Sequence, residues 1–378
     1  MHSLEFVLAG RHYTLDELRN WSESATTAAL SENALDTLRF CQQWLAGEPS
    51  FVVTTSGSTG TPKPITLTRE QMIASAWRTG ETLALQAGQA TLVCMPTRYI
   101  AGRMMLVRGF VLAMPMTIVE PASDPVATLP PDAAFAFTAM VPLQLQTVLN
   151  GPPAYHAILN RMQAILIGGG PVSPVLQAQL QQLTAPIYHT YGMTETVTHI
   201  ALRRLNGPTA SDAFMPLKGV QLGIDARGCL NIRSDITQEE VVQTNDFVEL
   251  RADGSFVWLG RWDNVINSGG VKVQVEKVEN AIDQVLYALD PQDAAQRRFF
   301  VGALPDERLG EKVVLVSEGA PFSPALAASL RAQLKTRLDK YEIPRLFYAL
   351  PHFAETPTRK IDRKATLAQL TDVIEPRM

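Results

Sequence analysis

Short apolar segments alternate with helical segments over roughly the first 200 residues, and this alternation most constrains the fold. The predicted strands cover residues 51–55, 90–95, 116–120, 133–138, 165–167 and 187–190. The predicted helices cover residues 70–85, 103–112, 142–149 and 174–183. Strands that alternate with helices form βαβ units, whose strands pair in parallel beneath covering helices. The sequence therefore predicts an α/β fold in which mainly parallel sheets are flanked by helices.

The pattern changes after about residue 215. Residues 241–250 and 256–259 flank a turn that contains Gly254, which predicts a β-hairpin. Residues 260–270 are polar and rich in glycine, as in a linker. Ser323 and Pro324 are typical of a helix start, here predicted over residues 324–338. We predict a large N-terminal domain, residues 1–262, and a small C-terminal α+β domain on a hinge, residues 263–378.

Composition and charge exclude several classes of protein. The chain has 378 residues, of which 46% are hydrophobic and 19% charged, as in ordinary globular proteins. Its net charge of −4 argues against a nucleic-acid partner. The longest apolar run, residues 110–119, is shorter than the roughly 18 residues of a membrane span. Three widely spaced cysteines and the lack of a signal-peptide pattern favour a cytoplasmic protein.

The run from Thr54 to Lys63 reads Thr-Thr-Ser-Gly-Ser-Thr-Gly-Thr-Pro-Lys. Glycines let the backbone approach an anion, hydroxyl and N–H groups donate to phosphate oxygens, and Lys63 adds charge. The spacing differs from that of the P-loop of nucleotide triphosphatases. On composition alone, a phosphate-binding loop and a plain surface loop are equally compatible with this run.

Three further segments carry residues that can bind a ligand or take part in catalysis. In 188–195, Glu195 can ligate Mg²⁺ and Tyr191 can stack on a base. Arg261, beside glycine in 259–270, can reach a nucleotide. A lysine in the basic run 356–364 can stabilise developing negative charge. Taken singly, each segment is also explained by a solvated turn or loop.

In this order and at these separations, the segments resemble the adenylate-forming superfamily of acyl-CoA synthetases, peptide-synthetase adenylation domains and luciferases. The resemblance extends from about residue 51 to residue 364. The matching motifs are Thr55–Lys63 (phosphate loop), Tyr191–Glu195 (Y-G-x-T-E), Thr244–Asp246 (T-G-D), Gly260–Asp263 (G-R-x-D), Pro305–Glu311 (P-D-x-x-x-G-E) and Lys360 (catalytic lysine).

The resemblance implies an enzyme that uses ATP, Mg²⁺ and CoA. The implied nucleotide-binding residues are Thr55, Ser56, Gly57, Ser58, Thr59, Gly60, Thr61, Lys63, Gly168, Gly169, Gly170, His189, Thr190, Tyr191, Gly192, Asp246 and Arg261. The implied catalytic residues are Lys360, Glu195 and Thr194, the last two as metal ligands. The implied hinge is Asp263, and Ser268, Gly269 and Gly270 face CoA. The implied acyl pocket consists of Tyr99, Ile100, Ala101, Gly102, Val141, Gln144, Met193 and His199.

The chain departs from the family pattern at a few positions. Pro64, Asn245 and Arg359 each replace a family glycine, and Tyr99 replaces the histidine of the P-x-x-H-x-x-G motif. Only about 50 residues precede the phosphate loop, so the N-terminal part is shortened or rebuilt. Tyr99 is expected to alter the acyl pocket.

Within the superfamily, Ser268-Gly269-Gly270 and stretches at 138–145, 165–172 and 190–196 resemble o-succinylbenzoate–CoA ligases of menaquinone biosynthesis. Such a ligase forms an acyl-adenylate and then a CoA thioester of a small carboxylic acid. The candidates to bind the second carboxylate of succinylbenzoate are Arg98, Arg103, Gln144 and His199. The alternatives are another aryl- or acyl-CoA ligase, a stand-alone enzyme that loads a carrier protein, and a nucleotide-binding pseudoenzyme. The sequence leaves open whether the chain forms a homo-oligomer.

Overall fold

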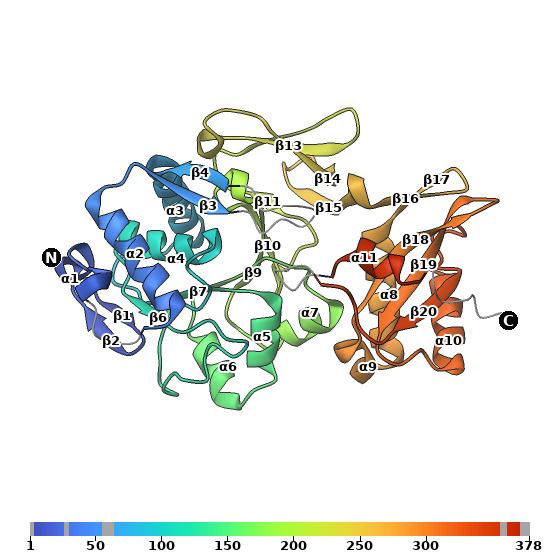
Figure 1. Ribbon diagram of the computed structural model, residues 1–378, viewed down its shortest axis with the longest axis horizontal. Helices are drawn as coiled ribbons and strands as arrows, with labels where there is room; N and C mark the ends of the chain where they lie inside the picture. Colours follow the sequence, from blue (N-terminus) through green and yellow to red (C-terminus); the bar gives the residue numbers. More distant parts are fainter. Residues whose placement is uncertain (1–3, 26–29, 55–63, 356–360, 371–378) are drawn as a thin grey trace.

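A computed structural model describes residues 4–25, 30–54, 64–355 and 361–370. The largest sheet has the strand order β11-β10-β9-β8-β7-β5-β6-β1-β2 (Figure 1). From β9 to β1 neighbouring strands are parallel, whereas β10, β11 and β2 pair antiparallel at the edges. The predicted, mainly parallel sheet is thus confirmed. Its strands are β1 (Phe6–Leu8), β2 (Arg11–Tyr13), β5 (Thr91–Val93), β6 (Met116–Ile118), β7 (Phe137–Met140), β8 (Ala164–Ile167), β9 (Ile187–Gly192), β10 (His199–Arg204) and β11 (Met215–Pro216).

Helices cover both faces of this sheet. Alternate strand residues point to opposite faces, so Leu166 joins the core beneath α2, α3 and α4, whereas Ile165 and Ile167 join the core beneath α5, α6 and α7. Proline at the first position starts α5, whose bounds match the prediction. The helices are α1 (Leu15–Arg19), α2 (Glu32–Ala46), α3 (Arg69–Leu83), α4 (Ile100–Val111), α5 (Pro142–Leu149), α6 (Pro153–Asn160) and α7 (Pro174–Leu180).

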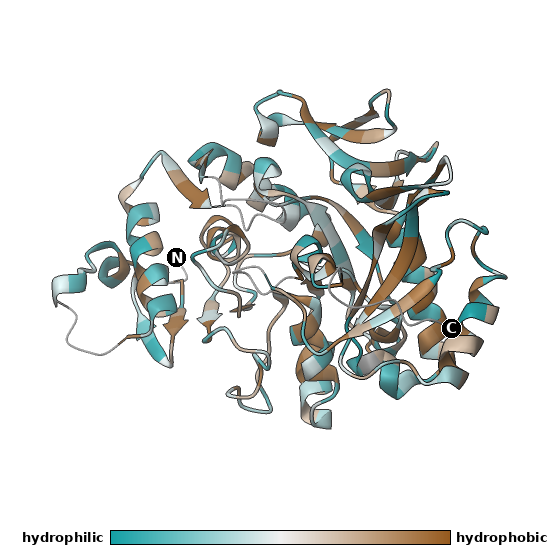
Figure 2. Cartoon of the chain, turned by 45° about the vertical axis from the view of Figure 1, so that its right-hand side comes forward, coloured by the Kyte–Doolittle hydropathy of each residue, from teal (hydrophilic) through white to brown (hydrophobic). Residues whose placement is uncertain are grey.

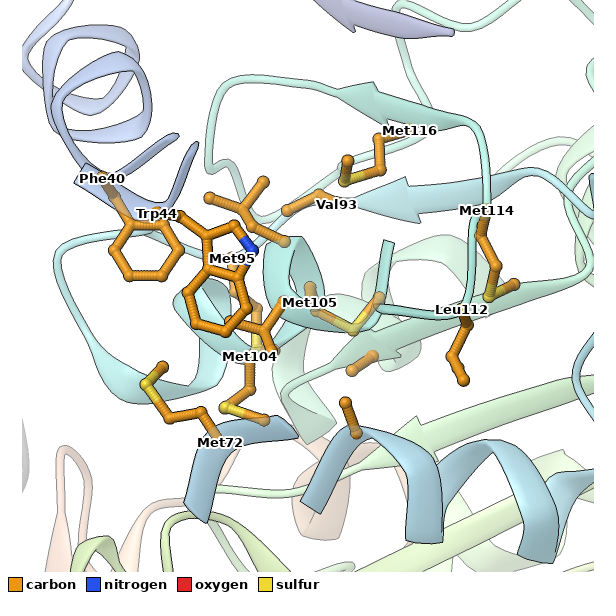
Figure 3. Close-up of a cluster of buried hydrophobic side chains, with 14 of the residues drawn as sticks. Phe40, Trp44, Met72, Val93, Met95, Met104, Met105, Leu112, Met114 and Met116 are labelled. Atoms are coloured by element: carbon orange, nitrogen blue, oxygen red, sulfur yellow. The ribbon is translucent and has the colours of Figure 1, made fainter. Parts of the chain in front are cut away.

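Methionines fill much of the core between α2, α3 and α4 (Figure 3). Met104 and Met105 lie on α4, Met72 lies on α3, and the rings of Phe40 and Trp44 project from α2. Methionine is flexible and fills irregular spaces. This core therefore surrounds α4 with side chains that can adjust to a neighbour.

The predicted strand 51–55 lies outside the parallel sheet, so its assignment to a βαβ unit was wrong. It is β3 (Ser50–Thr54), which pairs antiparallel with β4 (Pro64–Thr68). Its residues alternate between exposed and buried, so only one of its faces packs on the core. Strands of a parallel sheet are instead buried on both faces. Other predicted elements have shifted ends: for example, the strand expected at 133–138 is β7.

A second, antiparallel sheet has the order β12-β13-β14-β15. Its strands are β12 (Gln221–Ile224), β13 (Cys229–Arg233), β14 (Val242–Leu250) and β15 (Phe256–Arg261), with the 3₁₀ turn η3 (Asp235–Thr237) after β13. Leu250 pairs with Phe256, which confirms the predicted hairpin. The remaining 3₁₀ turns are η1 (Glu23–Ala25), η2 (Thr194–Thr196) and η4 (Trp262–Asn264).

A third sheet begins at Val265, with the order β17-β16-β19-β18 and with β20 parallel to β19. Its strands are β16 (Val265–Ser268), β17 (Val271–Gln274), β18 (Phe299–Asp306), β19 (Gly310–Glu318) and β20 (Leu346–Leu350). Its helices are α8 (Val275–Leu289), α9 (Pro291–Gln296), α10 (Pro324–Leu334) and α11 (Arg363–Ala368). Ser323 caps α10 as predicted, although the helix ends before residue 338. Figure 2 shows hydrophobic residues concentrated in the strands of the sheets.

The connection between the second and third sheets differs from the predicted linker. Residues 260–270 form the end of β15, then η4, β16 and the turn before β17, so most of this backbone is paired with neighbouring strands. Polar residues and glycines occur both in linkers and in short turns between strands, so composition alone did not distinguish the two. The predicted domain boundary at 262 falls within η4 and stays a prediction.

Candidate active site

The glycine run after β8 lies against β9, at the carboxyl edge of the parallel sheet. The Thr190 hydroxyl donates to the Ile167 carbonyl at 3.2 Å, and His189 Nε2 lies 3.3 Å from the Gly170 carbonyl oxygen. A Cβ at Gly168 would lie 2.4 Å from Thr190 Oγ1, so only glycine permits this approach. Ligands of open α/β sheets bind at this edge. The fold therefore brings together two of the predicted nucleotide-binding segments, including Gly169.

His189 is neutral in this structure. Burial and the nearby Arg203 guanidinium lower the pKa of His189 to about 4. Arg203 Nη2 lies 3.2 Å from His189 Nδ1, and arginine can only donate, so the ring proton resides on Nε2 and points to the Gly170 carbonyl. Sequence reasoning missed Arg203, which lies on β10, a strand that it did not predict.

Tyr191 connects the parallel sheet to the antiparallel sheet. Its hydroxyl donates to Asp246 Oδ2 at 2.6 Å, and its ring lies 5.0 Å from the Phe256 ring and 5.8 Å from the Phe214 ring. Burial and the neighbouring Asp246 carboxylate raise the pKa of Tyr191. The predicted base-binding and ribose-binding residues are therefore direct neighbours in space.

The turn after β9 presents Glu195 to solvent. Gly192 faces Thr198 across the β9–β10 connection, and a Cβ on this glycine would lie 2.2 Å from the Thr198 carbonyl oxygen. Thr194 and Glu195 begin η2, and Val197 follows with a φ of 63°. A β-branched residue at positive φ is strained and persists only where the surroundings hold it. The two proposed metal ligands thus lie on a backbone that is locally constrained.

The Gln144 amide, which was assigned to the acyl pocket, already has partners within the protein. Its side chain is 6% exposed, and Nε2 donates to the carbonyl oxygens of Cys94 at 3.2 Å and Ala122 at 2.9 Å. Its Oε1 accepts from the backbone N–H of Val141 at 3.1 Å. The amide is therefore used to hold the start of α5, which leaves no donor for a substrate carboxylate.

The remaining predicted pocket residues lie around the ends of α4 and β9. Tyr99 precedes α4, and Ile100, Ala101 and Gly102 form its first turn. A Cβ at Gly102 would lie 2.4 Å from the Pro96 carbonyl oxygen. Met193 follows β9 and His199 begins β10, and the assignment of these residues to one acyl pocket stays a prediction.

Arg98 and Arg103, two predicted carboxylate-binding candidates, have other partners. Arg103 donates from Nε to the Thr97 carbonyl at 3.1 Å and from Nη1 to the Val52 carbonyl at 2.8 Å. It therefore braces β3, the strand that leads into residues 55–63. Arg98 is exposed, lies 3.9 Å from Glu32, and covers the Tyr99 ring.

Arg108 is the functional candidate that sequence reasoning missed. It lies on α4, is 2% exposed, and has no carboxylate partner within the described part of the chain. Its Nη2 donates to Thr198 Oγ1 at 3.2 Å, Nη1 lies 3.7 Å from the Met105 sulfur, and Nε has no partner among the described residues. Burial lowers the pKa of Arg108 to about 9. The available signal was an arginine that follows four apolar residues within a mainly apolar helix.

Arg261 and Asp263 bind each other. Arg261 donates from Nε to Asp263 Oδ1 at 2.8 Å and from Nη2 to Oδ2 at 2.7 Å, which holds the pKa of the Asp263 carboxyl below its usual range. Glu276, on α8, accepts from Asn264 Nδ2 at 2.6 Å. A Cβ at Gly260 would lie 2.5 Å from Glu276 Oε2. The predicted ribose-binding arginine and the predicted hinge aspartate thus form one cluster with the start of α8.

Ser268 ends β16, and Gly269 and Gly270 form the turn that leads into β17. Gly269 and Gly270 have φ values of 60° and 82°, and the Gly269 N–H donates to the Leu309 carbonyl at 2.8 Å. These positive φ values favour glycine.

The AMP-binding enzyme family matches residues 9–226. The chain belongs to the AMP-binding enzyme family. A probable 2-succinylbenzoate–CoA ligase of Mycobacterium tuberculosis is 31% identical over 360 residues, which cover 88% of each protein. The expected membership of the adenylate-forming superfamily, and the expected AMP-forming acyl-CoA ligase class, are confirmed.

Solved structures of this family share the fold. An acyl-CoA synthetase (AMP-forming)/AMP-acid ligase II-like protein of Dyadobacter fermentans is 44% identical, has a TM-score of 0.60, and matches over 92% of this chain and 97% of its own. The o-succinylbenzoate CoA synthetase of Bacillus subtilis, in complex with ATP and magnesium, is 20% identical, with a TM-score of 0.68 over 84% of this chain and 69% of its own. The same synthetase in complex with its acyl-adenylate intermediate is 22% identical, with a TM-score of 0.70 over 86% of this chain and 70% of its own.

The catalytic lysine and the phosphate loop expected of this family, Lys360 and Thr55–Lys63, lie outside the described residues. Thr54 pairs with Pro64, so the β3–β4 hairpin joins the two ends of the segment 55–63. The other site assignments also stay predictions. None of the helices in the described ranges is long and apolar enough to cross a membrane.

Proposed function

We propose that the chain is an ATP-dependent 2-succinylbenzoate–CoA ligase of menaquinone biosynthesis. The observation that carries this proposal is Arg108, a buried cation without a carboxylate partner in the described residues. An uncompensated buried charge costs several kcal/mol, roughly as much as a ligand carboxylate would restore. Succinylbenzoate carries two carboxylates, so one can react while the other neutralises this cation. The names of the relatives support the same substrate.

Met105 explains how Arg108 can be buried and still receive a ligand. The Met105 sulfur lies 3.7 Å from Nη1, and a thioether is a weak acceptor on a flexible side chain. A carboxylate oxygen is a much stronger partner for a guanidinium. We infer that the Met105 side chain moves aside when the substrate carboxylate binds.

The proposed reaction begins with attack of the reacting carboxylate oxygen on the α-phosphorus of ATP. The bond between the α-phosphorus and the bridging oxygen breaks, and pyrophosphate leaves with that electron pair. In the second step the CoA thiolate attacks the acyl carbon, and AMP leaves. In this proposal Asp246 binds the ribose, Tyr191 and Gly168–Gly170 enclose the adenine, and Lys360 stabilises the charge that develops between carboxylate and phosphate.

Glu195 and Thr194 fit a magnesium ion that binds together with the nucleotide. Their carboxylate and hydroxyl oxygens are hard donors, and Mg²⁺ is commonly held by one or two carboxylates together with phosphates and water. In the described part of the chain no three His, Cys, Asp or Glu side chains form a metal-binding group. When bound, the ion supplies neutralisation of phosphate charge.

We further propose that residues 1–262 and 263–378 move relative to each other about Asp263, so that Ser268–Gly270 replace Lys360 at the site during thioester formation. The Dyadobacter protein supports this proposal, because its TM-score of 0.60 is low for 44% identity. Such a low TM-score is expected if each of the two domains is alike in both proteins but their relative orientation differs. A cytoplasmic location agrees with the buried, unpaired thiols of Cys41, Cys94 and Cys229. Homo-oligomer formation stays open.

The proposal is tested by thioester formation from a panel of acids with ATP, Mg²⁺ and CoA. The panel contains 2-succinylbenzoate, benzoate, coumarate and medium-chain fatty acids. We expect the highest kcat/KM for succinylbenzoate. A higher value for another acid would make the chain a different acyl-CoA ligase, and ATP binding without turnover of any acid would make it a pseudoenzyme.

A further inference from the structure

A chain of buried polar groups leads from Arg108 into the core between α4, β10 and α3. Arg108 Nη2 lies 3.2 Å from Thr198 Oγ1, which lies 3.2 Å from His199 Nδ1. His199 Nε2 lies 3.3 Å from Thr79 Oγ1, which donates to the Ser75 carbonyl oxygen at 2.9 Å. Arg108, His199 and Thr79 are 2%, 5% and 0% exposed. These hydrogen bonds therefore take the place of the ones that water would make to the same buried groups.

The direction of every hydrogen bond in this chain is determined by its two ends. Arginine can only donate, so Thr198 accepts from Arg108 and gives its own proton to His199 Nδ1. A carbonyl can only accept, so the Thr79 proton goes to Ser75, and the Thr79 oxygen accepts from His199. His199 must therefore carry its proton on Nε2. Burial and the adjacent Arg108 charge, which hold the pKa of His199 well below its ordinary value, agree with a neutral ring.

We propose that Thr198, His199 and Thr79 are positioning residues, which orient the Arg108 guanidinium toward the second carboxylate of the acyl substrate. Thr198 accepts from one nitrogen of the guanidinium, Nη2, whereas Nε has no partner among the described residues and Nη1 faces the Met105 sulfur. Thr198 uses only one of the two Nη2 hydrogens, so the other one, together with the hydrogen of Nε or of Nη1 on the same edge, can hold a carboxylate in a bidentate manner. This inference rests on the proposed function, because it assigns a dicarboxylate to Arg108.

The backbone between the reacting end and this anchoring end is also constrained. Val197, at a φ of 63°, lies between Glu195 and Thr198, and the Thr198 N–H donates to the Thr196 carbonyl at 2.6 Å. Such a tight turn with positive φ at its centre is rare and strained. It fixes the Thr198 hydroxyl relative to Glu195. The structure thus links the anchor of one carboxylate to the group proposed to act at the other.

The test is Thr79→Val, which keeps the side-chain shape and lies three hydrogen bonds away from Arg108. We expect the KM for succinylbenzoate to rise about three- to tenfold, as for the loss of one neutral hydrogen bond, with kcat and the KM for ATP changed less than about twofold. The matched control is Thr91→Val. Thr91 is also buried and donates to the Phe137 carbonyl at 3.0 Å, but it takes no part in the series of hydrogen bonds from Arg108 to Ser75. The control should leave both KM values unchanged.

Two further measurements separate positioning from general stability. In an Arg108→Met background, Thr79→Val should no longer alter the KM for succinylbenzoate, because its effect passes through Arg108. Thr79→Ser, which keeps the hydroxyl that Thr79→Val removes, should have the wild-type KM for succinylbenzoate. Nitrogen-15 NMR of histidine-labelled protein, assigned with His199→Gln, should show the Nε2–H tautomer.

An Nδ1–H tautomer in the wild type would overturn the inference, even if Thr79→Val fails to fold. An unchanged KM in folded Thr79→Val would overturn it as well. In both cases the ligase itself would still turn over succinylbenzoate. Failure of the wild type to turn over succinylbenzoate is a different result, which overturns the proposed function and this role together.

Discussion

The Tyr191 hydroxyl donates a 2.6 Å hydrogen bond to the Asp246 carboxylate and so joins two sheets at the candidate nucleotide site. Tyr191 lies near the end of β9 in the main sheet, and Asp246 lies within β14 of the antiparallel sheet. Asp246 is 9% exposed, so the phenol replaces water as a donor to this carboxylate. The orientation of the proposed ribose ligand therefore depends on the neighbouring tyrosine.

Tyr191→Phe removes this donor and keeps the ring. We expect the KM for ATP to rise about tenfold, because a hydrogen bond to a charged group contributes roughly 1.5–3 kcal/mol and Asp246 is left without this partner. Pyrophosphate exchange measures the effect. Tyr188→Phe is the control, since the Tyr188 hydroxyl accepts a 3.4 Å contact from Arg204 and does not touch Asp246. Equal effects of the two substitutions would contradict a specific role for Tyr191.

His189 should make the folded protein less stable in mild acid. Its pKa is lowered from 6.5 to about 4, so the unfolded chain binds a proton between these values while the folded chain does not. The free energy of unfolding therefore falls as the pH drops from 6.5 to 4, by up to about 1.4 kcal/mol per pH unit from this group, and levels off below. Urea titrations across this range should give a smaller slope for His189→Gln than for wild type.

Gly260→Ala should destabilise the arrangement of the second and third sheets. The added Cβ would lie 2.5 Å from Glu276 Oε2, and the φ of 146° is unfavourable for alanine. We expect a loss of about 2–3 kcal/mol in unfolding free energy. Gly254→Ala is the matched control, because Gly254 also has positive φ (84°) but its Cβ would meet no atom within 4 Å. A similar loss in both variants would assign the effect to backbone strain alone.

Lys360→Ala should slow adenylation far more than thioester formation. The reason is the family motif, in which this lysine acts only in the first half-reaction. Pyrophosphate release in single-turnover experiments measures the first step, and thioester formation from added acyl-adenylate measures the second. Equal slowing of both steps would contradict the proposed exchange of Lys360 for Ser268–Gly270.

The sequence predicted those elements whose signals are local. Pro142 at the start of α5 and the Ser323-Pro324 pair at the start of α10 act within one turn of helix, and both helices begin as expected. The mainly parallel sheet followed from alternation along the chain. Strand β4 and the antiparallel strand β10 were not predicted, because the stability of a strand depends on the neighbours with which it pairs and packs.

In the candidate site too, local motifs were found in the sequence, whereas contacts between distant residues were not predicted. Motifs found Tyr191 and Asp246, although nothing in their spacing indicated that they bind each other. Gln144 was assigned to the pocket from its place in the chain, whereas its amide holds backbone carbonyls. Arg108 was missed because an arginine in a predicted helix usually faces solvent, and only packing reveals that this one is buried.

The central claim is that Arg108 selects a second carboxylate, and the most direct measurement is the ratio of kcat/KM for 2-succinylbenzoate to that for benzoate. The account predicts a large ratio in the wild type that falls about 30-fold or more in Arg108→Met, through loss of succinylbenzoate activity alone. An unchanged ratio in a folded Arg108→Met variant would contradict the account.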